Sequence, residues 1–149
     1  MKKVFYLLAL VLAVTFLTGC FNTKTLTCKK VDEELIPSEK VYITEKISYN
    51  KKNNTFGDLK YSLELDLNES NMTDGAKTSL INKMTEKLKE TCNEYKKAKS
   101  CDVTSRTEYD VKVTTVASRE VIDAESGNYS TLEELRSYYE GKGYTCKEE

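Results

Sequence analysis

Cysteine is the residue type in this chain whose spacing constrains its chemistry most. The sequence has five cysteines among 149 residues and no histidine. Cys20 lies shortly after a long apolar stretch, whereas the other four are separated from one another by 64, 9 and 45 residues. A thiol can form a disulfide, bind zinc or carry a covalent group, so its surroundings decide among these. The four later cysteines are Cys28, Cys92, Cys101 and Cys146.

The N-terminus predicts that Cys20 carries a lipid. Two lysines precede an apolar stretch at residues 4–16, which is long enough for a signal peptide and too short to span a bilayer. The stretch leads into Leu17-Thr18-Gly19-Cys20, which resembles the lipobox of bacterial lipoproteins. The resemblance implies a diacylglyceryl group on the Cys20 thiol, with fatty chains such as palmitate, and cleavage after Gly19.

An uncleaved membrane anchor and an ordinary secretory signal are the alternatives. A spanning helix needs about 20 apolar residues, but Asn22, Lys24 and Thr25 end the apolar stretch soon after Cys20. Ordinary secretory cleavage favours an A-x-A-like site, which Leu17 fits poorly. The lipobox interpretation is therefore preferred.

The four later cysteines predict two disulfides. An even number of cysteines is typical of small exported domains, and four cysteines allow three pairings. Zinc sites use closely paired cysteines or histidines, which this chain lacks, while free buried thiols remain a further alternative. The predicted order of helices and strands favours Cys92 with Cys101, across one turn, and Cys28 with Cys146, across the two ends of the domain.

Composition limits the size of the domain and the class of its partners. Without residues 1–19 the chain has 130 residues, enough for one domain. Lys2 and Lys3 lie in the removed segment, so 21 basic residues remain against 24 acidic ones and the net charge is about −3. No excess of cations is present to displace phosphate counterions, which argues against nucleic acid as a partner.

Periodicity predicts an α+β fold with an antiparallel sheet of about four strands and two helices packed on one face. Apolar residues alternate at 41–49, 59–67 and 109–115, which is typical of half-buried strands. Three- and four-residue spacing predicts a helix over about 75–98, and Ser130 with Glu133 predicts a capping box for a second helix. Residues 25–29 can start a strand around Cys28, and a short edge strand is expected at 144–146. The predicted organisation is a signal peptide at 1–19, a lipidated tether at 20–27 and a single extracytoplasmic domain at 28–149.

Glu45 is the one charged residue on the apolar side of its predicted strand. It marks either a bulge, a strand end or a functional position. The first two interpretations are the more common ones for such a residue.

The order of these elements resembles the YehR-like family of small bacterial lipoproteins. The resembling segments are the strand pair at 41–49 and 59–67, the helix around 80–95, the strand that starts at Glu108-Tyr109-Asp110, and Leu132-Glu133-Glu134-Leu135. The family has no established activity, so the resemblance implies a fold and a location without a reaction. The four later cysteines depart from the family's general pattern.

Catalytic chemistry finds little support in the sequence. The absence of histidine excludes Ser-His-Asp and Cys-His catalysis. Asp66-Leu67-Asn68-Glu69-Ser70 imitates the start of a calcium loop, but Asn71 and Lys77 occupy the positions of its glycine and bidentate glutamate. Neighbouring carboxylates at 33–34, 133–134 and 148–149 are acid and base candidates by type only. We therefore expect no enzyme, no catalytic residue, no cofactor and no metal.

The resulting expectation is a lipoprotein of the cell envelope, anchored to the outer face of the bacterial membrane through Cys20. It would be a binding or interaction module whose protein or small-molecule partner the sequence does not name. The alternatives are a structural envelope lipoprotein without a ligand and a carboxylate enzyme acting on wall or lipid substrates. Tyrosine is the one enriched recognition residue, and its candidates are Tyr42, Tyr109, Tyr129, Tyr138 and Tyr139.

Overall fold

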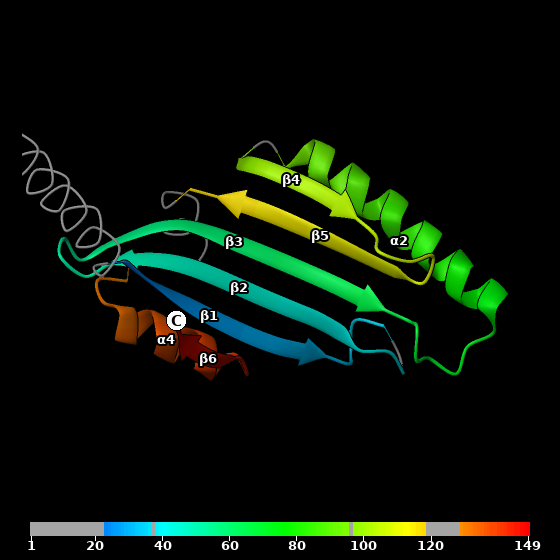
Figure 1. The fold of residues 1–149 in the computed structure, drawn as a ribbon, viewed down its shortest axis with the longest axis horizontal. Helices are drawn as coiled ribbons and strands as arrows, with labels where there is room; N and C mark the ends of the chain where they lie inside the picture. Colours follow the sequence, from blue (N-terminus) through cyan, green and yellow to red (C-terminus); the bar gives the residue numbers. More distant parts are fainter. Residues whose placement is uncertain (1–22, 37, 96, 119–128) are drawn as a thin grey trace, which may run out of the picture.

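The chain folds as one open, six-stranded antiparallel sheet with two helices packed against it (Figure 1). The structure is a computed structural model and describes residues 23–36, 38–95, 97–118 and 129–149. The strands follow the order β4-β5-β3-β2-β1-β6 across the sheet. Their bounds are β1 Thr23–Asp32, β2 Val41–Asn50, β3 Thr55–Asp66, β4 Ala98–Thr104, β5 Asp110–Ala117 and β6 Thr145–Glu148.

The hairpin of β2 and β3 forms the centre of the sheet, as the alternating pattern predicts. Val41 pairs with Leu65, and Ile43 pairs with Leu63. Every second residue of β2 is buried, from Val41 to Tyr49, whereas the residues between them are exposed or half-buried. Burial of one face of an antiparallel strand pair is what period-two hydrophobicity requires.

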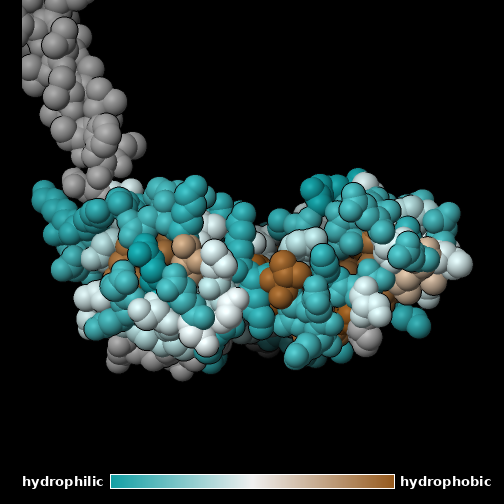
Figure 2. Space-filling view, turned by 90° about the horizontal axis from the view of Figure 1, so that it is seen from below, coloured by the Kyte–Doolittle hydropathy of each residue, from teal (hydrophilic) through white to brown (hydrophobic). Residues whose placement is uncertain are grey.

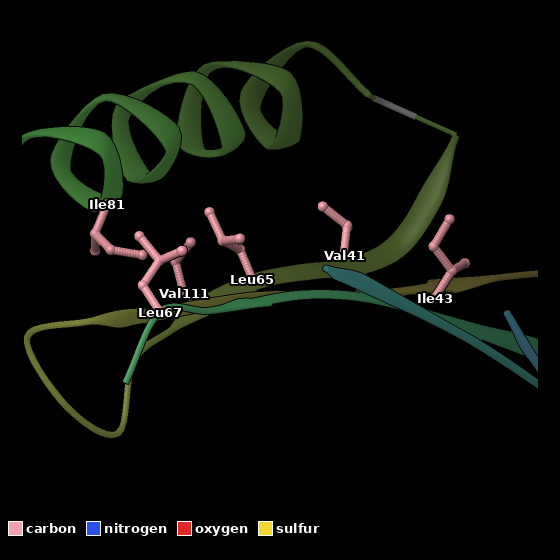
Figure 3. Close-up of a cluster of buried hydrophobic side chains, with 6 residues drawn as sticks. All are labelled: Val41, Ile43, Leu65, Leu67, Ile81 and Val111. Carbon is pink, nitrogen blue, oxygen red and sulfur yellow. The ribbon is translucent and has the colours of Figure 1, made fainter. Parts of the chain in front are cut away.

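Both helices lie on the same face of this sheet. Helix α2 (Asp74–Glu94) covers one end, where its Ile81 joins a core cluster with Val41 and Ile43. Figure 3 shows Ile81 pointing from the helix towards the sheet, and the other side chains of this cluster pointing from the sheet side towards the helix. Helix α4 (Leu132–Gly141) covers the other end, where Leu135 and Tyr139 pack with Ile47. Val41, Ile43 and Ile47 lie an even number of positions apart along β2, so their side chains point to one face of the sheet. That face carries both helices.

Helix α2 begins where the sequence predicts and ends earlier. Thr73 is its N-cap, and the Thr73 side chain accepts a hydrogen bond from the Ala76 backbone N–H. The last helical residue is Glu94, not a residue near 98, because the chain must turn back to begin β4 at Ala98.

The cap of α4 is shifted by one residue from the prediction. Thr131 and Glu134 form the capping box, in place of Ser130 and Glu133. Both pairs have the required spacing, so the sequence contains two overlapping boxes. In the helix that Thr131 caps, Leu135 and Tyr139 point inward and pack in the core.

We expect Thr131→Ala to lower the free energy of unfolding by about 1 kcal/mol, because it leaves a helix N-terminal N–H without its acceptor. Ser130→Ala is the matched control, since Ser130 contributes only its backbone N–H to Glu134. Urea denaturation measures both variants. A larger loss in Ser130→Ala would contradict the assignment of the cap.

The sheet has six strands where about four were expected, and it begins earlier in the chain. Residues 23–27, which were expected to belong to the tether, form the first half of β1, so the strand expected around Cys28 already begins at Thr23. This strand pairs with β2 on one side and with β6 on the other, so it is an inner strand. Its sequence lacks a long alternation because lysines occupy both faces: Lys29 lies on the face of the threonines, and Lys24 and Lys30 lie on the face of Leu26 and Cys28.

Both predicted disulfides are present. Cys28 is bonded to Cys146, and Cys92 is bonded to Cys101. Strand register places Cys101 and Cys146 at opposite ends of one row across the helix-covered face, with Glu45 in its middle. The row is Cys101–Thr115–Tyr61–Glu45–Cys28–Cys146. The two disulfides therefore fasten opposite edges: one joins α2 to β4, the other joins β6 to β1.

Candidate functional site

The face of the sheet opposite the helices is the first candidate site, and we call it the open face. Its residues alternate with those of the buried face, so β2 contributes Tyr42, Thr44 and Lys46. Within the described ranges neither helix packs on this side, since the core clusters of both lie on the other one. A shallow hollow of about 630 Å³ lies over it, lined by residues such as Lys29, Thr44 and Ser62.

Four lysines from four different strands gather on the open face. Lys46 of β2 lies directly opposite Lys60 of β3. Lys29 of β1 pairs with Thr44, next to Lys46 along the same face, and Lys147 of β6 pairs with Thr27. We call this set the lysine strip: Lys29, Lys46, Lys60 and Lys147. All four are exposed.

The lysine strip has little negative charge beside it. Among the described residues, Lys29, Lys60 and Lys147 have no salt bridge, and Lys46 has one long contact of 4.0 Å with Glu149. Of the other acidic residues of this face, Glu64 bonds Lys112 at 2.9 Å and also bonds Arg106, which lies 3.9 Å from Asp66. Asp102 lies on the far edge strand, β4, away from β1 and β6. The open face therefore has a basic part and a neutralised part.

We expect Lys60→Glu to raise the free energy of unfolding by roughly 0.5 kcal/mol. Like charges directly opposite each other destabilise a strand pair, and the substitution replaces that repulsion by an attraction. Lys52→Glu is the control, because Lys52 lies in the exposed turn between β2 and β3. Urea midpoints measure both. If Lys60→Glu were no more stable than Lys52→Glu, the claim that Lys46 and Lys60 repel each other would be contradicted.

Exposed apolar side chains lie next to the strip. Tyr42 is 44 % exposed and pairs with Val31, which is 47 % exposed. Both point to the open face, since Tyr42 alternates with the buried Val41 and Ile43. Figure 2, seen from below at right angles to Figure 1, shows that this side of the molecule is mainly hydrophilic, with some apolar side chains visible between its two lobes. Of the tyrosines named from the sequence, Tyr42 is thus the exposed one, whereas Tyr139 is buried and the other three are half-buried.

The second candidate is Glu45, which lies on the helix-covered face in mid-strand and is only 8 % exposed. It marks neither a bulge nor a strand end, because the register irregularity of β2 lies between Ile47 and Tyr49. Burial raises the pKa of the Glu45 carboxyl, while hydrogen bonds from Tyr139 and Tyr144 act in the opposite direction. Since both hydroxyls belong to the C-terminal segment, Glu45 links α4 and the approach to β6 to the central strand.

The tyrosines around Glu45 respond to the same burial. Burial raises the pKa of Tyr139, of Tyr144 and of Tyr61, and the Glu45 charge adds to each shift. Lys142 supplies a weak opposing charge to Glu45. Glu45 is thus a buried carboxylate whose hydrogen bonds are supplied by neighbouring tyrosines. These contacts account for a charged residue at this buried position without a bound ligand.

We expect Glu45→Gln to be more stable than the wild type at pH 8, with the difference shrinking towards pH 4. Folding raises the pKa of the Glu45 carboxyl above its ordinary value of 4.5. The contribution of Glu45 to stability is therefore complete below pH 4.5 and is lost as the pH rises through the raised pKa. Asp32, Asp66 and Glu148 have lowered pKa values and give the opposite slope. The measurement is therefore the difference in free energy of unfolding between Glu45→Gln and the wild type as a function of pH. A difference that does not change with pH would contradict the prediction.

The residues predicted from the sequence have different outcomes. Cys20 lies outside the described residues, whereas the other four cysteines form the two disulfides. Glu134 belongs to the cap of α4, and Glu148 bonds Lys24 and Arg136, each at 2.7 Å. In the calcium-like loop, Asp66 accepts hydrogen bonds from Asn68 as part of a turn.

Tyr129 and Tyr138, two of the recognition candidates, form an aromatic pair with ring centroids 5.0 Å apart. The Lys142 ammonium lies 4.1 Å from the Tyr138 ring centroid. The pair borders a hollow that also includes Thr131 and Glu133. Because both rings are half-buried, this pair contributes more to packing around Tyr139 than to an exposed apolar surface.

No family model, curated protein or solved structure matches the chain. Within the described residues, neither helix is both long enough and apolar enough to cross a membrane. The lysine strip was not visible from the sequence, because it depends on register across four strands. Glu45 was visible as a charge in an apolar row, although its tyrosine partners were not.

Proposed function

We propose that this protein is a lipid-anchored extracytoplasmic module, without catalytic function, that binds its partner through the open face of the sheet. The observation that carries the proposal is the start of β1 at Thr23, three residues after the lipobox cysteine. Three peptide units span at most about 11 Å. A lipid on Cys20 therefore holds the first strand directly at the bilayer surface.

The cysteines support an extracytoplasmic location. Two disulfides in a single small domain are typical of an oxidising compartment. A diacylglyceryl group supplies two fatty chains, which anchor stably, whereas one chain anchors only marginally. The resemblance to YehR-like lipoproteins implies the same location.

The open face supports a binding role. An antiparallel sheet commonly leaves one polar face in water, but a row with two lysines opposite each other costs stability. Such a cost is typical of a surface whose charge serves binding. Of the candidate carboxylates, Glu134 takes part in a helix cap, and Glu133 and Glu148 form ion pairs with Arg136, which gives the enzyme alternative no support.

Expression of the full chain and of Cys20→Ala tests the anchor. We expect the wild type to stay in the membrane fraction after a wash with about 1 M salt, which screens electrostatic contacts, and Cys20→Ala to be released. Globomycin should block processing of the wild type. Cys92→Ala/Cys101→Ala is the control, because it removes two cysteines that form a disulfide and leaves Cys20. Equal membrane retention of Cys20→Ala and wild type would contradict the proposal.

A further inference from the structure

We infer that the lysine strip binds the anionic phospholipid headgroups of the bilayer that carries the anchor, so that the domain lies with its open face on the membrane. The inference rests on the proposed lipid anchor for its geometry. It goes beyond that proposal by naming the ligand class of the open face and the orientation of the domain.

The short tether limits where the strip can be. Thr23 pairs with Asn50, and Thr27 pairs with Lys46. Lys46 is thus four residues along the sheet from the tethered end, or about 13 Å, and Lys29 is six residues along, or about 20 Å. In an upright domain these charges would be farther from the surface than the Debye length of about 8 Å. Only a domain turned onto its open face brings the whole strip to the headgroups.

The charge of the strip fits a diffuse anionic surface. Lysine is a compact point charge, whereas arginine forms bidentate bonds with an individual phosphate, and the strip contains no arginine. Lys29, Lys60 and Lys147 lack salt bridges among the described residues, and the opposed Lys46 and Lys60 repel each other. Headgroup charge would relieve that repulsion.

The far end of the open face supplies a second type of contact. Val31 lies eight residues along β1 from Thr23, about 26 Å, and its cross-strand neighbour is Tyr42. Both side chains are more than two-fifths exposed. Tyrosine is enriched at the membrane–water interface because its ring is apolar and its hydroxyl is polar. The pair would hold down the end of the sheet that the tether does not reach.

Vesicle binding of the non-lipidated chain tests the inference independently of the anchor. The chain without residues 1–19 and with Cys20→Ala is mixed with vesicles of phosphatidylcholine, with or without about 30 % phosphatidylglycerol. Because the mature chain carries a net charge of about −3, binding to anionic vesicles requires a local basic surface. We expect binding only with phosphatidylglycerol, and its loss at about 1 M salt.

Charge reversal identifies the face. Each lysine near an anionic surface contributes about fivefold to binding, so Lys46→Glu/Lys60→Glu should weaken binding by about 25-fold or more. The control variant Lys83→Glu/Lys87→Glu, on the exposed side of α2, changes the net charge by the same amount. It should change vesicle binding by less than about threefold. Thermal unfolding of each variant checks the fold, and Lys46→Gln/Lys60→Gln, expected to lose about 25-fold, replaces the reversal if that variant unfolds.

Three results would overturn the inference: no binding to phosphatidylglycerol vesicles, equal losses in the two double variants, or tighter binding to soluble poly(glycerol phosphate) than to vesicles. The last result would assign the strip to an anionic wall polymer. None of these results depends on lipidation, so failure of the anchor proposal is recognised separately, by fractionation of the full chain.

Discussion

Replacement of Cys28 and Cys146 together by alanine is expected to lower the free energy of unfolding by about 5 kcal/mol. The disulfide joins residues 118 apart in the sequence, and in the loop-entropy model the stabilisation grows with the logarithm of the loop length. Small domains have about 5–15 kcal/mol in total, so the loss would consume a large part of the stability. Guanidinium denaturation of the oxidised protein measures it.

The second disulfide is the matched control. Cys92 and Cys101 are nine residues apart, which gives about 2.6 kcal/mol in the same model. We expect the first double variant to lose roughly twice as much as Cys92→Ala/Cys101→Ala. The effect should also be local: β6 has four residues and lies at the sheet edge, so hydrogen exchange should speed up there first. Equal losses in the two variants would contradict this account.

Tyr139→Ala is expected to cost about 3–5 kcal/mol, as is typical of a buried aromatic residue replaced by alanine. Tyr139 is 3 % exposed and packs in one cluster with Leu26, Ile47 and Leu135. Its ring also contacts those of Tyr138 and Tyr144, each with centroids 5.3 Å away. Removal of the ring would therefore separate α4 from the sheet, and chemical denaturation measures the cost.

Tyr139→Phe separates the hydroxyl from the ring. Because the Tyr139 hydroxyl lowers the pKa of Glu45, its loss should raise that pKa further and cost about 1–2 kcal/mol. A raised carboxyl pKa reduces stability as pH rises, so the loss should be greater at pH 8 than at pH 5. Tyr138→Phe is the control. A loss in Tyr139→Phe that does not change with pH would show that the hydroxyl does not act through Glu45.

The strongly periodic parts of the chain were predictable, and the weakly periodic parts were not. The hairpin of β2 and β3 has one apolar face, which period-two hydrophobicity reveals. Strand β1 places Leu26 and Cys28 inward, and its other residues apart from Val31 are threonine or charged, so it was expected to be partly tether. Strand β4 is a polar edge strand with no apolar run to mark it.

The candidate sites depend on contacts between distant parts of the chain. The opposition of Lys46 and Lys60 follows from hairpin register, but Lys147 reaches the same face only because β6 pairs with β1. Glu45 likewise receives its hydroxyl partners from residues almost one hundred positions later. Local periodicity carries no information about such pairings, whereas the disulfides could be paired because the predicted elements brought their cysteines to shared edges.

Intact mass spectrometry of the native protein, extracted from membranes with detergent, tests the central claim most directly. The lipid-anchor account predicts a chain that begins at Cys20 and carries the added mass of a diacylglyceryl group with its two fatty chains. A native chain that retains residues 1–19 and carries no acyl mass would contradict it.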